Sequence, residues 1–174
     1  MDNFVTQARL ASFWRVKMLI TVAAKLRTIV MFNSRAFNLS DPKPYFINDC
    51  CFGDDLAKWL IEEFRSRNVV VDGDPGQEDF GWFFGFKIER AAHFFVIAYR
   101  NDDQQKGATW IGWVERNRGL LGFIFGGPER WVKKEAVELI HHALSNSPLI
   151  CDVRWHFRAD FEGGVEDRGA SSPA

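Results

Sequence analysis

A run of aromatic residues at every second position constrains the fold of this chain more than any other feature. Large apolar side chains occupy alternate positions from Phe80 to Ile88, and glycine or charged residues fill most positions between them. Because successive side chains of a β-strand point to opposite faces, this pattern predicts a strand with one buried face. The next stretch, residues 92–99, is apolar on both faces and predicts a central strand of the same sheet.

Four further segments extend the expected sheet. Strands are predicted at residues 45–47, 69–71, 109–115 and 149–157, and the last of these alternates again. Three consecutive strands with short connections indicate an antiparallel meander.

Two segments have the spacing of amphipathic helices. One is predicted from Asp54 to about Arg67, and the other follows Pro128 and ends near Asn146. Two such helices can cover one face of an antiparallel sheet. The sequence therefore predicts an α+β fold, in which an antiparallel β-meander sheet carries two amphipathic helices on one face as a two-layer sandwich.

Charge and composition divide the 174 residues into three parts. Residues 1–36 contain six basic residues and a single acidic one, so they read as a basic N-terminal extension with a net charge of +5. Residues 37–162 are predicted to form a single α+β domain, and the chain outside the extension carries a net charge of −6. Residues 163–174 contain few apolar side chains and are predicted to be a disordered tail.

The basic extension allows two interpretations. It is a dispensable or non-native segment before a natural start at Met31, or it targets the chain to an organelle. We expect a cytoplasmic location, with organelle targeting through this segment as the alternative. A variant that begins at Met31 is expected to fold with nearly the stability of the full chain.

The three cysteines do not form a disulfide framework. Cys50 and Cys51 are adjacent and Cys151 is distant, a pattern that indicates a reducing compartment. We expect Cys50 and Cys51 to be small residues that pack beside the first helix. No apolar run is long enough for a transmembrane helix.

No residue spacing typical of catalysis or metal binding occurs. The chain has no C-x-x-C pair, no histidine pair four residues apart on a helix and no G-x-S-x-G segment. We therefore expect no catalytic residues, no metal and no cofactor. The acidic body disfavours nucleic-acid binding, because the phosphate backbone has to be met by clustered Lys and Arg side chains.

These features favour a small non-catalytic binding module that recognises a protein partner, of the inhibitor or immunity-protein type by analogy. An acidic surface would speed docking onto a basic partner. The predicted partner contacts lie in and just after an apolar, glycine-bounded loop: Leu121, Phe123, Phe125 and Trp131.

An enzyme or small-ligand carrier is the alternative. An antiparallel sheet under two helices can enclose a pocket, and the aromatic content suggests which residues would line it. The predicted lining residues are Trp82, Phe84, Trp110 and Trp113.

Overall fold

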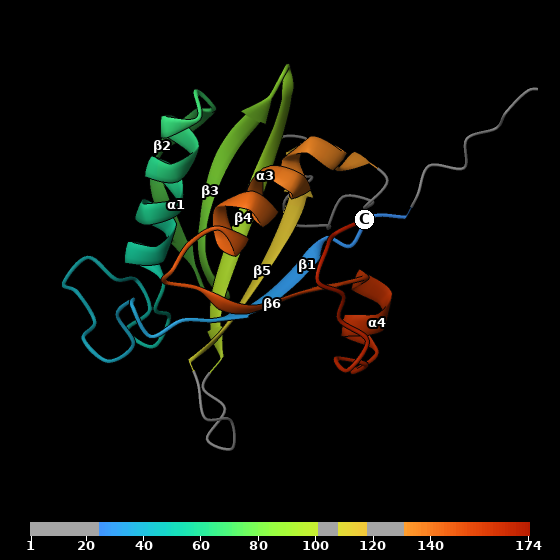
Figure 1. Ribbon diagram of the computed structural model, residues 1–174. Helices are drawn as coiled ribbons and strands as arrows, with labels where there is room; N and C mark the ends of the chain where they lie inside the picture. The colour runs from blue at the N-terminus through green and yellow to red at the C-terminus, as the bar shows by residue number, and fades with distance from the viewer. Residues whose placement is uncertain (1–24, 101–107, 118–130) are drawn as a thin grey trace, which may run out of the picture.

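The computed structural model describes residues 25–100, 108–117 and 131–174. Within these residues six strands form one open antiparallel sheet, in the order β2-β3-β4-β5-β1-β6 (Figure 1). The strands are β1 (Ile29–Asn33), β2 (Val70–Glu78), β3 (Gly81–Ile88), β4 (Ala91–Arg100), β5 (Thr109–Arg116) and β6 (Cys151–His156). The helices are α1 (Asp54–Ser66), α3 (Lys134–Ser145) and α4 (Arg158–Glu162). The predicted α+β fold, an antiparallel meander with two helices on one face, is confirmed.

The alternating aromatic strand is β3, and its buried side chains form the centre of the core. Phe84 faces Phe95 of β4, and their ring centroids lie 6.0 Å apart. Phe64 of α1 packs its ring against Phe84 at 5.4 Å and against Phe86 at 5.1 Å. Burying one such side chain stabilises the fold by about 1.5–3 kcal/mol, so this aromatic group joins the helix firmly to the sheet.

The alternation fails at its first residue. The pattern predicts Phe80 on the same face as Trp82, but the Phe80 ring contacts Trp113, 5.9 Å away, on the other face of the sheet. The cause lies in Gly81, whose φ of 141° turns the chain as it enters β3. Period-two reasoning holds only inside a regular strand, and this turn ends the regularity.

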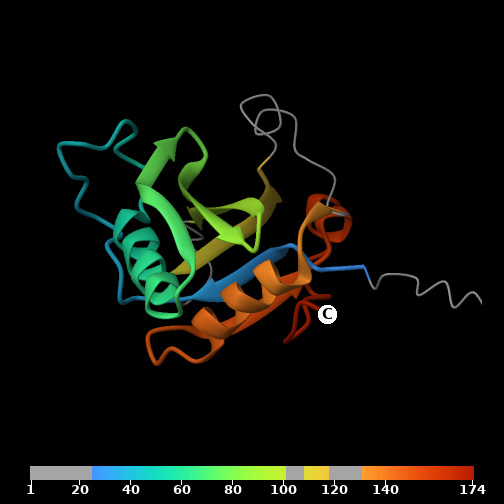
Figure 2. The same cartoon turned by 90° about the horizontal axis from the view of Figure 1, so that it is seen from above.

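The two long helices share one side of the sheet (Figure 2). Helix α1 contacts β2 and β3, and α3 contacts β6 and α1, so each covers one half. Helix α1 begins at the predicted Asp54, whereas α3 begins at Lys134, later than the start predicted at Pro128, a residue that lies outside the described ones. In the described part of the chain, no helix has the length and apolar character required to cross a membrane.

The sheet contains a strand that the sequence pattern does not indicate. β1 lies between β5 and β6, with Val30 opposite Gly112 on one side and Trp155 on the other. Val30 and Phe32 are buried in the core. The folded domain therefore includes residues that the charge pattern assigns to the basic extension, and it begins before residue 29 rather than at residue 37. The five residues of β1 lie between Arg27 and Arg35, so composition averaged over 1–36 conceals them.

The predicted strand at 45–47 is absent, because residues 34–53 connect β1 to α1 as a loop in which no strand is formed. Strand β2 is longer than expected. It continues beyond residue 71 through the Gly- and Pro-containing stretch, with a register shift against β3 between Asp72 and Gly76. The turn that reverses the chain comes later, at residues 79–80.

The C-terminal residues are part of the fold rather than a disordered tail. The Arg100 guanidinium binds both carboxylate oxygens of Glu166, at 2.7 and 2.8 Å. The backbone of Ala170 exchanges two hydrogen bonds with Trp155, at 2.7 and 2.9 Å. The backbone N–H of Arg27 donates to the Pro173 carbonyl oxygen at 2.9 Å. Backbone hydrogen bonds and an ion pair hold this segment in place, so its low apolar content does not indicate whether it is ordered.

Candidate functional site

The four residues predicted to line a pocket do not face a common space. Trp82, Phe84 and Trp110 are buried in the core between the sheet and the helices. Trp113 follows Trp110 by three positions, an odd spacing that places it on the opposite face of β5, against Phe80. The indole N–H of Trp110 donates to the Ser34 carbonyl oxygen at 3.1 Å, which satisfies its polar atom inside the core.

Only one of the four predicted partner contacts belongs to the described residues. Leu121, Phe123 and Phe125 lie outside the described residues. Trp131 is described, and its side chain is partly exposed just before α3 begins. Its contact with a partner stays a prediction.

A different set of exposed apolar side chains lies on the loop before α1 and on the turn between β2 and β3. Figure 1 shows that this loop runs beside the end of the sheet where α1 begins. Ile47 is 78% exposed, Tyr45 54% and Phe80 43%. Three exposed carboxylates, those of Asp49, Glu78 and Asp79, belong to the same loop and turn. We call these six residues the loop–turn face; within it, the Tyr45 ring packs on Trp82, whereas the Phe80 ring turns toward Trp113 on the other side of the sheet.

A buried glutamine holds the two halves of this face together. Gln77 of β2 is only 7% exposed. Its Oε1 accepts hydrogen bonds from the backbone N–H groups of Ile47 and Asn48, and its Nε2 donates to the carbonyl oxygens of Asn48 at 2.9 Å and Cys51 at 3.1 Å. A buried amide with four partners is fully satisfied and fixes the loop against β2.

A tryptophan of β3 adds a further bond to the same loop. The indole Nε1 of Trp82 donates to the carbonyl oxygen of Cys51 at 2.7 Å. The Tyr45 ring packs edge-on against the Trp82 ring with centroids 6.4 Å apart. The loop therefore rests on side chains of two neighbouring strands.

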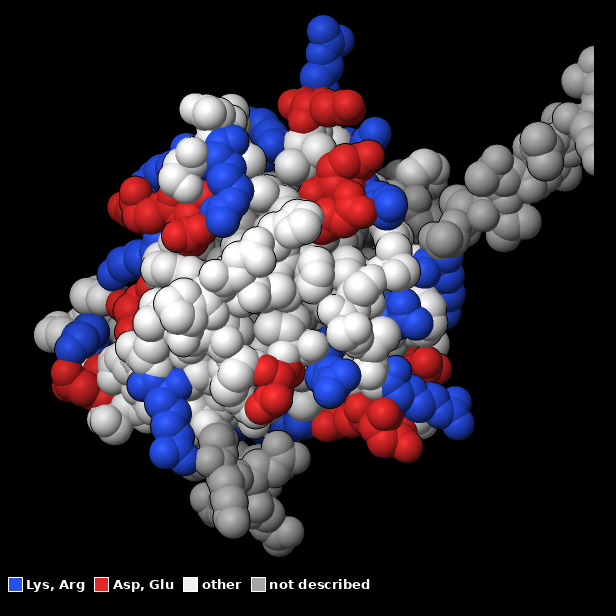
Figure 3. All heavy atoms as spheres, in the orientation of Figure 1, with Lys and Arg blue, Asp and Glu red and all other residues white. Residues whose placement is uncertain are grey.

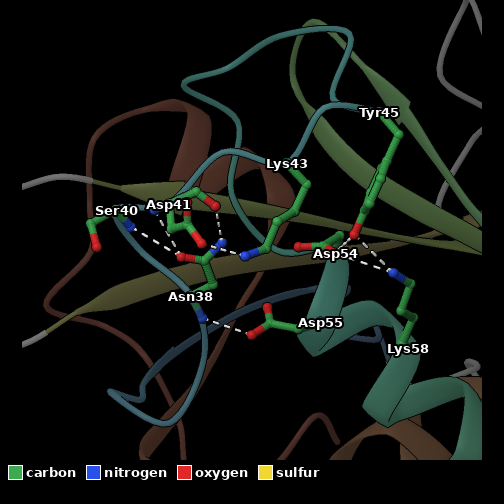
Figure 4. A network of polar contacts seen from close by, with 8 residues as sticks. All are labelled: Asn38, Ser40, Asp41, Lys43, Tyr45, Asp54, Asp55 and Lys58. Atoms are coloured by element: carbon green, nitrogen blue, oxygen red, sulfur yellow. Dashed lines mark hydrogen bonds and ion pairs between the residues drawn. The ribbon is translucent and has the colours of Figure 1, made fainter.

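The start of α1 anchors the other half of the loop through the polar network drawn in Figure 4. The buried carboxylate of Asp54 accepts hydrogen bonds from the Tyr45 hydroxyl at 2.6 Å and from the Lys58 ammonium at 3.2 Å. Asp55 accepts a hydrogen bond from the Asn38 backbone N–H at 2.7 Å. Burial raises the pKa of Asp55, although the bonds from Asn38 and Leu56 oppose that shift. Carboxylates at a helix N-terminus also interact favourably with the helix dipole.

The charge on the loop–turn face is of one sign and uncompensated within the described residues. Asp49, Glu78 and Asp79 are exposed, and none of them forms an ion pair with another residue in that part of the chain. The face over α1 and α3 is different, because Figure 3 shows an uncharged centre there with both acidic and basic groups around it. The loop–turn face thus combines exposed apolar side chains with net negative charge.

Sequence reasoning misses this face for a physical reason. The pattern assigns Tyr45 and Ile47 to a strand, and Gln77 lies in a segment that resembles a turn. A single glutamine carries no periodic signal, so its role as a clamp emerges only when the loop folds against β2. The sequence offers one signal, which is that Asp residues are interspersed with large apolar residues within positions 45–55.

One titratable side chain away from the loop–turn face, that of His93, has a structural role. His93 is fully buried beneath α3, where its ring stacks on Phe86 with centroids 5.5 Å apart. Its Nε2 accepts a hydrogen bond from the Lys133 backbone N–H at 3.3 Å, so Nδ1 carries the proton and donates to the Ala91 carbonyl oxygen at 2.9 Å. Burial, together with the nearby charges of Arg116 and Lys133, lowers the pKa of His93 to about 4.

This histidine predicts a pH-dependent stability. Between the ordinary pKa of 6.5 and the folded value of about 4, the unfolded chain binds a proton that the folded chain does not. The free energy of unfolding should therefore fall as pH drops through this window, by up to about 3 kcal/mol in total. Urea unfolding at several pH values measures the loss. His93→Leu should be less stable at pH 7 and should lose less stability on acidification; an unchanged pH dependence would contradict the assignment.

The described residues offer no metal centre, because no group of three His, Cys, Asp or Glu side chains is arranged there to hold an ion. Comparison of the chain with protein-family models, with curated proteins and with solved structures finds no match.

Proposed function

We propose that this chain is a non-catalytic binding module that recognises a protein partner through the loop–turn face. The observation that carries the proposal is the exposed Ile47 side chain on a loop whose backbone is fixed by the buried Gln77. Presenting an apolar side chain on a rigid loop lowers the ordering cost of association. The Tyr45 hydroxyl is likewise held by Asp54, so its ring is fixed on the same loop, two residues before Ile47.

The chemistry of this face indicates the kind of partner. Exposed apolar side chains that enter a pocket of the partner act as anchors, and a charged rim around them sets orientation and association rate. Here the rim consists of Asp49, Glu78 and Asp79. The partner that fits is a protein whose surface has an apolar pocket bordered by Lys or Arg side chains.

The test begins with affinity capture of a stoichiometric partner from native extract, followed by titration of the purified pair. Ile47→Asp should weaken binding at least about tenfold, because it removes an apolar anchor and adds like charge to an acidic rim. Asp79→Lys should slow association and reduce its dependence on salt concentration.

The matched control is Leu149→Asp, which places the same charge on another exposed apolar position, between α3 and β6. It should leave the dissociation constant unchanged. Failure to recover any stoichiometric partner, or a partner that binds Ile47→Asp as tightly as the unmodified chain, would overturn the proposal. A partner released instead by Trp131→Asp would identify the surface before α3 as the binding face.

A further inference from the structure

We propose that Cys50 and Cys51 form a redox-active thiol pair that a hydroperoxide converts to a disulfide between these adjacent residues. The inference concerns a modification site, and it holds whether or not the loop–turn face binds a partner.

The two thiols lie together on one tight turn. The backbone N–H of Cys51 donates to the Asn48 carbonyl oxygen at 3.1 Å, which closes the turn. The side-chain oxygen of Asn48 accepts from the Cys50 backbone N–H at 3.2 Å and from its thiol at 2.9 Å. This geometry holds Cys50 at the outer side of the turn, where it is exposed.

The second thiol is less accessible and is positioned beside the first. Cys51 is half-buried, and its thiol donates to the Asp79 carbonyl oxygen at 3.5 Å. Burial raises the pKa of Cys51, and the adjacent Cys50 thiol raises it further, so the two groups interact. Cys50 is therefore the thiol that a peroxide meets first, and Cys51 is the neighbour that resolves the product.

The chemistry balances with a hydroperoxide as the oxidant. The Cys50 thiolate attacks the peroxide, the O–O bond breaks, an alcohol or water leaves, and Cys50 becomes a sulfenic acid. The Cys51 sulfur then attacks the Cys50 sulfur, an S–S bond forms, the S–O bond breaks and water leaves. In total, the two thiols give up two electrons and two protons to the peroxide.

The resulting bond should be easy to reduce. A disulfide normally joins residues whose Cα atoms are about 4.4–6.8 Å apart, whereas neighbours in the chain are only about 3.8 Å apart. The small ring is strained, and strained disulfides are the readily reduced, regulatory kind. Oxidation would also twist the peptide that leads to the Cys51 carbonyl, which accepts hydrogen bonds from Trp82 and Gln77.

Cys151 provides an internal comparison. It is an exposed thiol at the start of β6, where it donates to the Asn33 carbonyl oxygen at 3.6 Å. It has no adjacent cysteine in the sequence, so peroxide should leave it as a sulfenic acid or as an intermolecular disulfide.

The experiment treats the reduced full chain with equimolar hydrogen peroxide, blocks free thiols and maps the tryptic peptide of residues 36–58, which holds both cysteines. This peptide should lose two hydrogen atoms in mass, resist alkylation and regain both thiols with a reductant. The loss should persist in Cys151→Ser and disappear in both Cys50→Ser and Cys51→Ser.

Circular dichroism of the two serine variants checks that they fold, and tryptophan fluorescence gives a second measurement. Peroxide should change the emission of the unmodified chain reversibly and leave that of Cys50→Ser unchanged, because the Trp82 hydrogen bond to Cys51 responds only when the ring forms. Recovery of Cys50 as a sulfinic acid beside a free Cys51 would overturn the proposal. So would a Cys50 or Cys51 disulfide found only between two chains.

Discussion

A truncated variant that begins at Met31 is expected not to unfold cooperatively near the melting temperature of the full chain. The truncation removes Ile29 and Val30, both buried, from a strand that lies between β5 and β6. Each lost side chain costs about 1.5–3 kcal/mol, and the new charged amino terminus would sit between two strands, away from water. A domain of this kind has about 5–15 kcal/mol of stability in total, so little or none would remain.

Thermal unfolding followed by circular dichroism measures this effect. A variant that begins at Lys25 is the control, because it keeps β1 whole and retains the hydrogen bond from Arg27 to Pro173. We expect the Met31 variant to melt at least about 10 °C below the Lys25 variant, if it melts cooperatively at all. Similar melting temperatures would show that β1 contributes little, and that the expectation drawn from composition is right.

Gly81→Ala is expected to destabilise the fold by more than about 4 kcal/mol. Gly81 has a φ of 141°, which L-residues with a side chain rarely adopt, and a Cβ atom there would lie 2.2 Å from the Ile97 carbonyl oxygen. That oxygen belongs to the backbone of β4, so it cannot move aside as a flexible side chain could. The turn between β2 and β3 would have to change, and Phe80 would move with it.

Gly73→Ala is the matched control, since Gly73 also has a positive φ, of 62°, but a Cβ atom at this position would have no neighbour within 4 Å. It should cost only about 1 kcal/mol, the ordinary penalty for a left-handed residue. Chemical unfolding of both variants separates the steric contribution from the conformational one. Equal losses in the two variants would contradict the close approach of β3 to β4 at Gly81.

Periodicity makes the larger part of the fold predictable from sequence. The spacing of Leu56, Leu60 and Phe64 locates α1, because burial on one side of a helix imposes a regular repeat. The alternation through Trp82, Phe84 and Phe86 locates β3 for the corresponding reason in a strand. These signals are local, and each is repeated several times within one element.

Sequence periodicity cannot predict features that depend on distant parts of the chain, or elements that are too short to show a repeat. Strand β1 has five residues, and its apolar character matters only because β5 and β6 lie on either side of it. The clamp made by Gln77 depends on a loop that is about 30 residues away in the chain. The placement of Trp110 and Trp113 on opposite faces of β5, by contrast, could have been predicted. Residues separated by an odd number of positions in a strand point to opposite faces of the sheet.

The position of β1 in the sheet order also governs how the chain folds. Its partners, residues 109–113 and 151–156, lie far along the sequence, so the β5-β1-β6 side of the sheet cannot be completed until nearly the whole chain is available. Contacts of such long range slow folding, because the loop entropy is lost before the contacts form. During synthesis from the N-terminus, the apolar segment Ile29–Asn33 would stay unpaired until the meander β2–β5 has formed. The basic residues on either side of it, Arg27 and Arg35, would then act as gatekeepers that discourage this exposed strand from pairing with another chain.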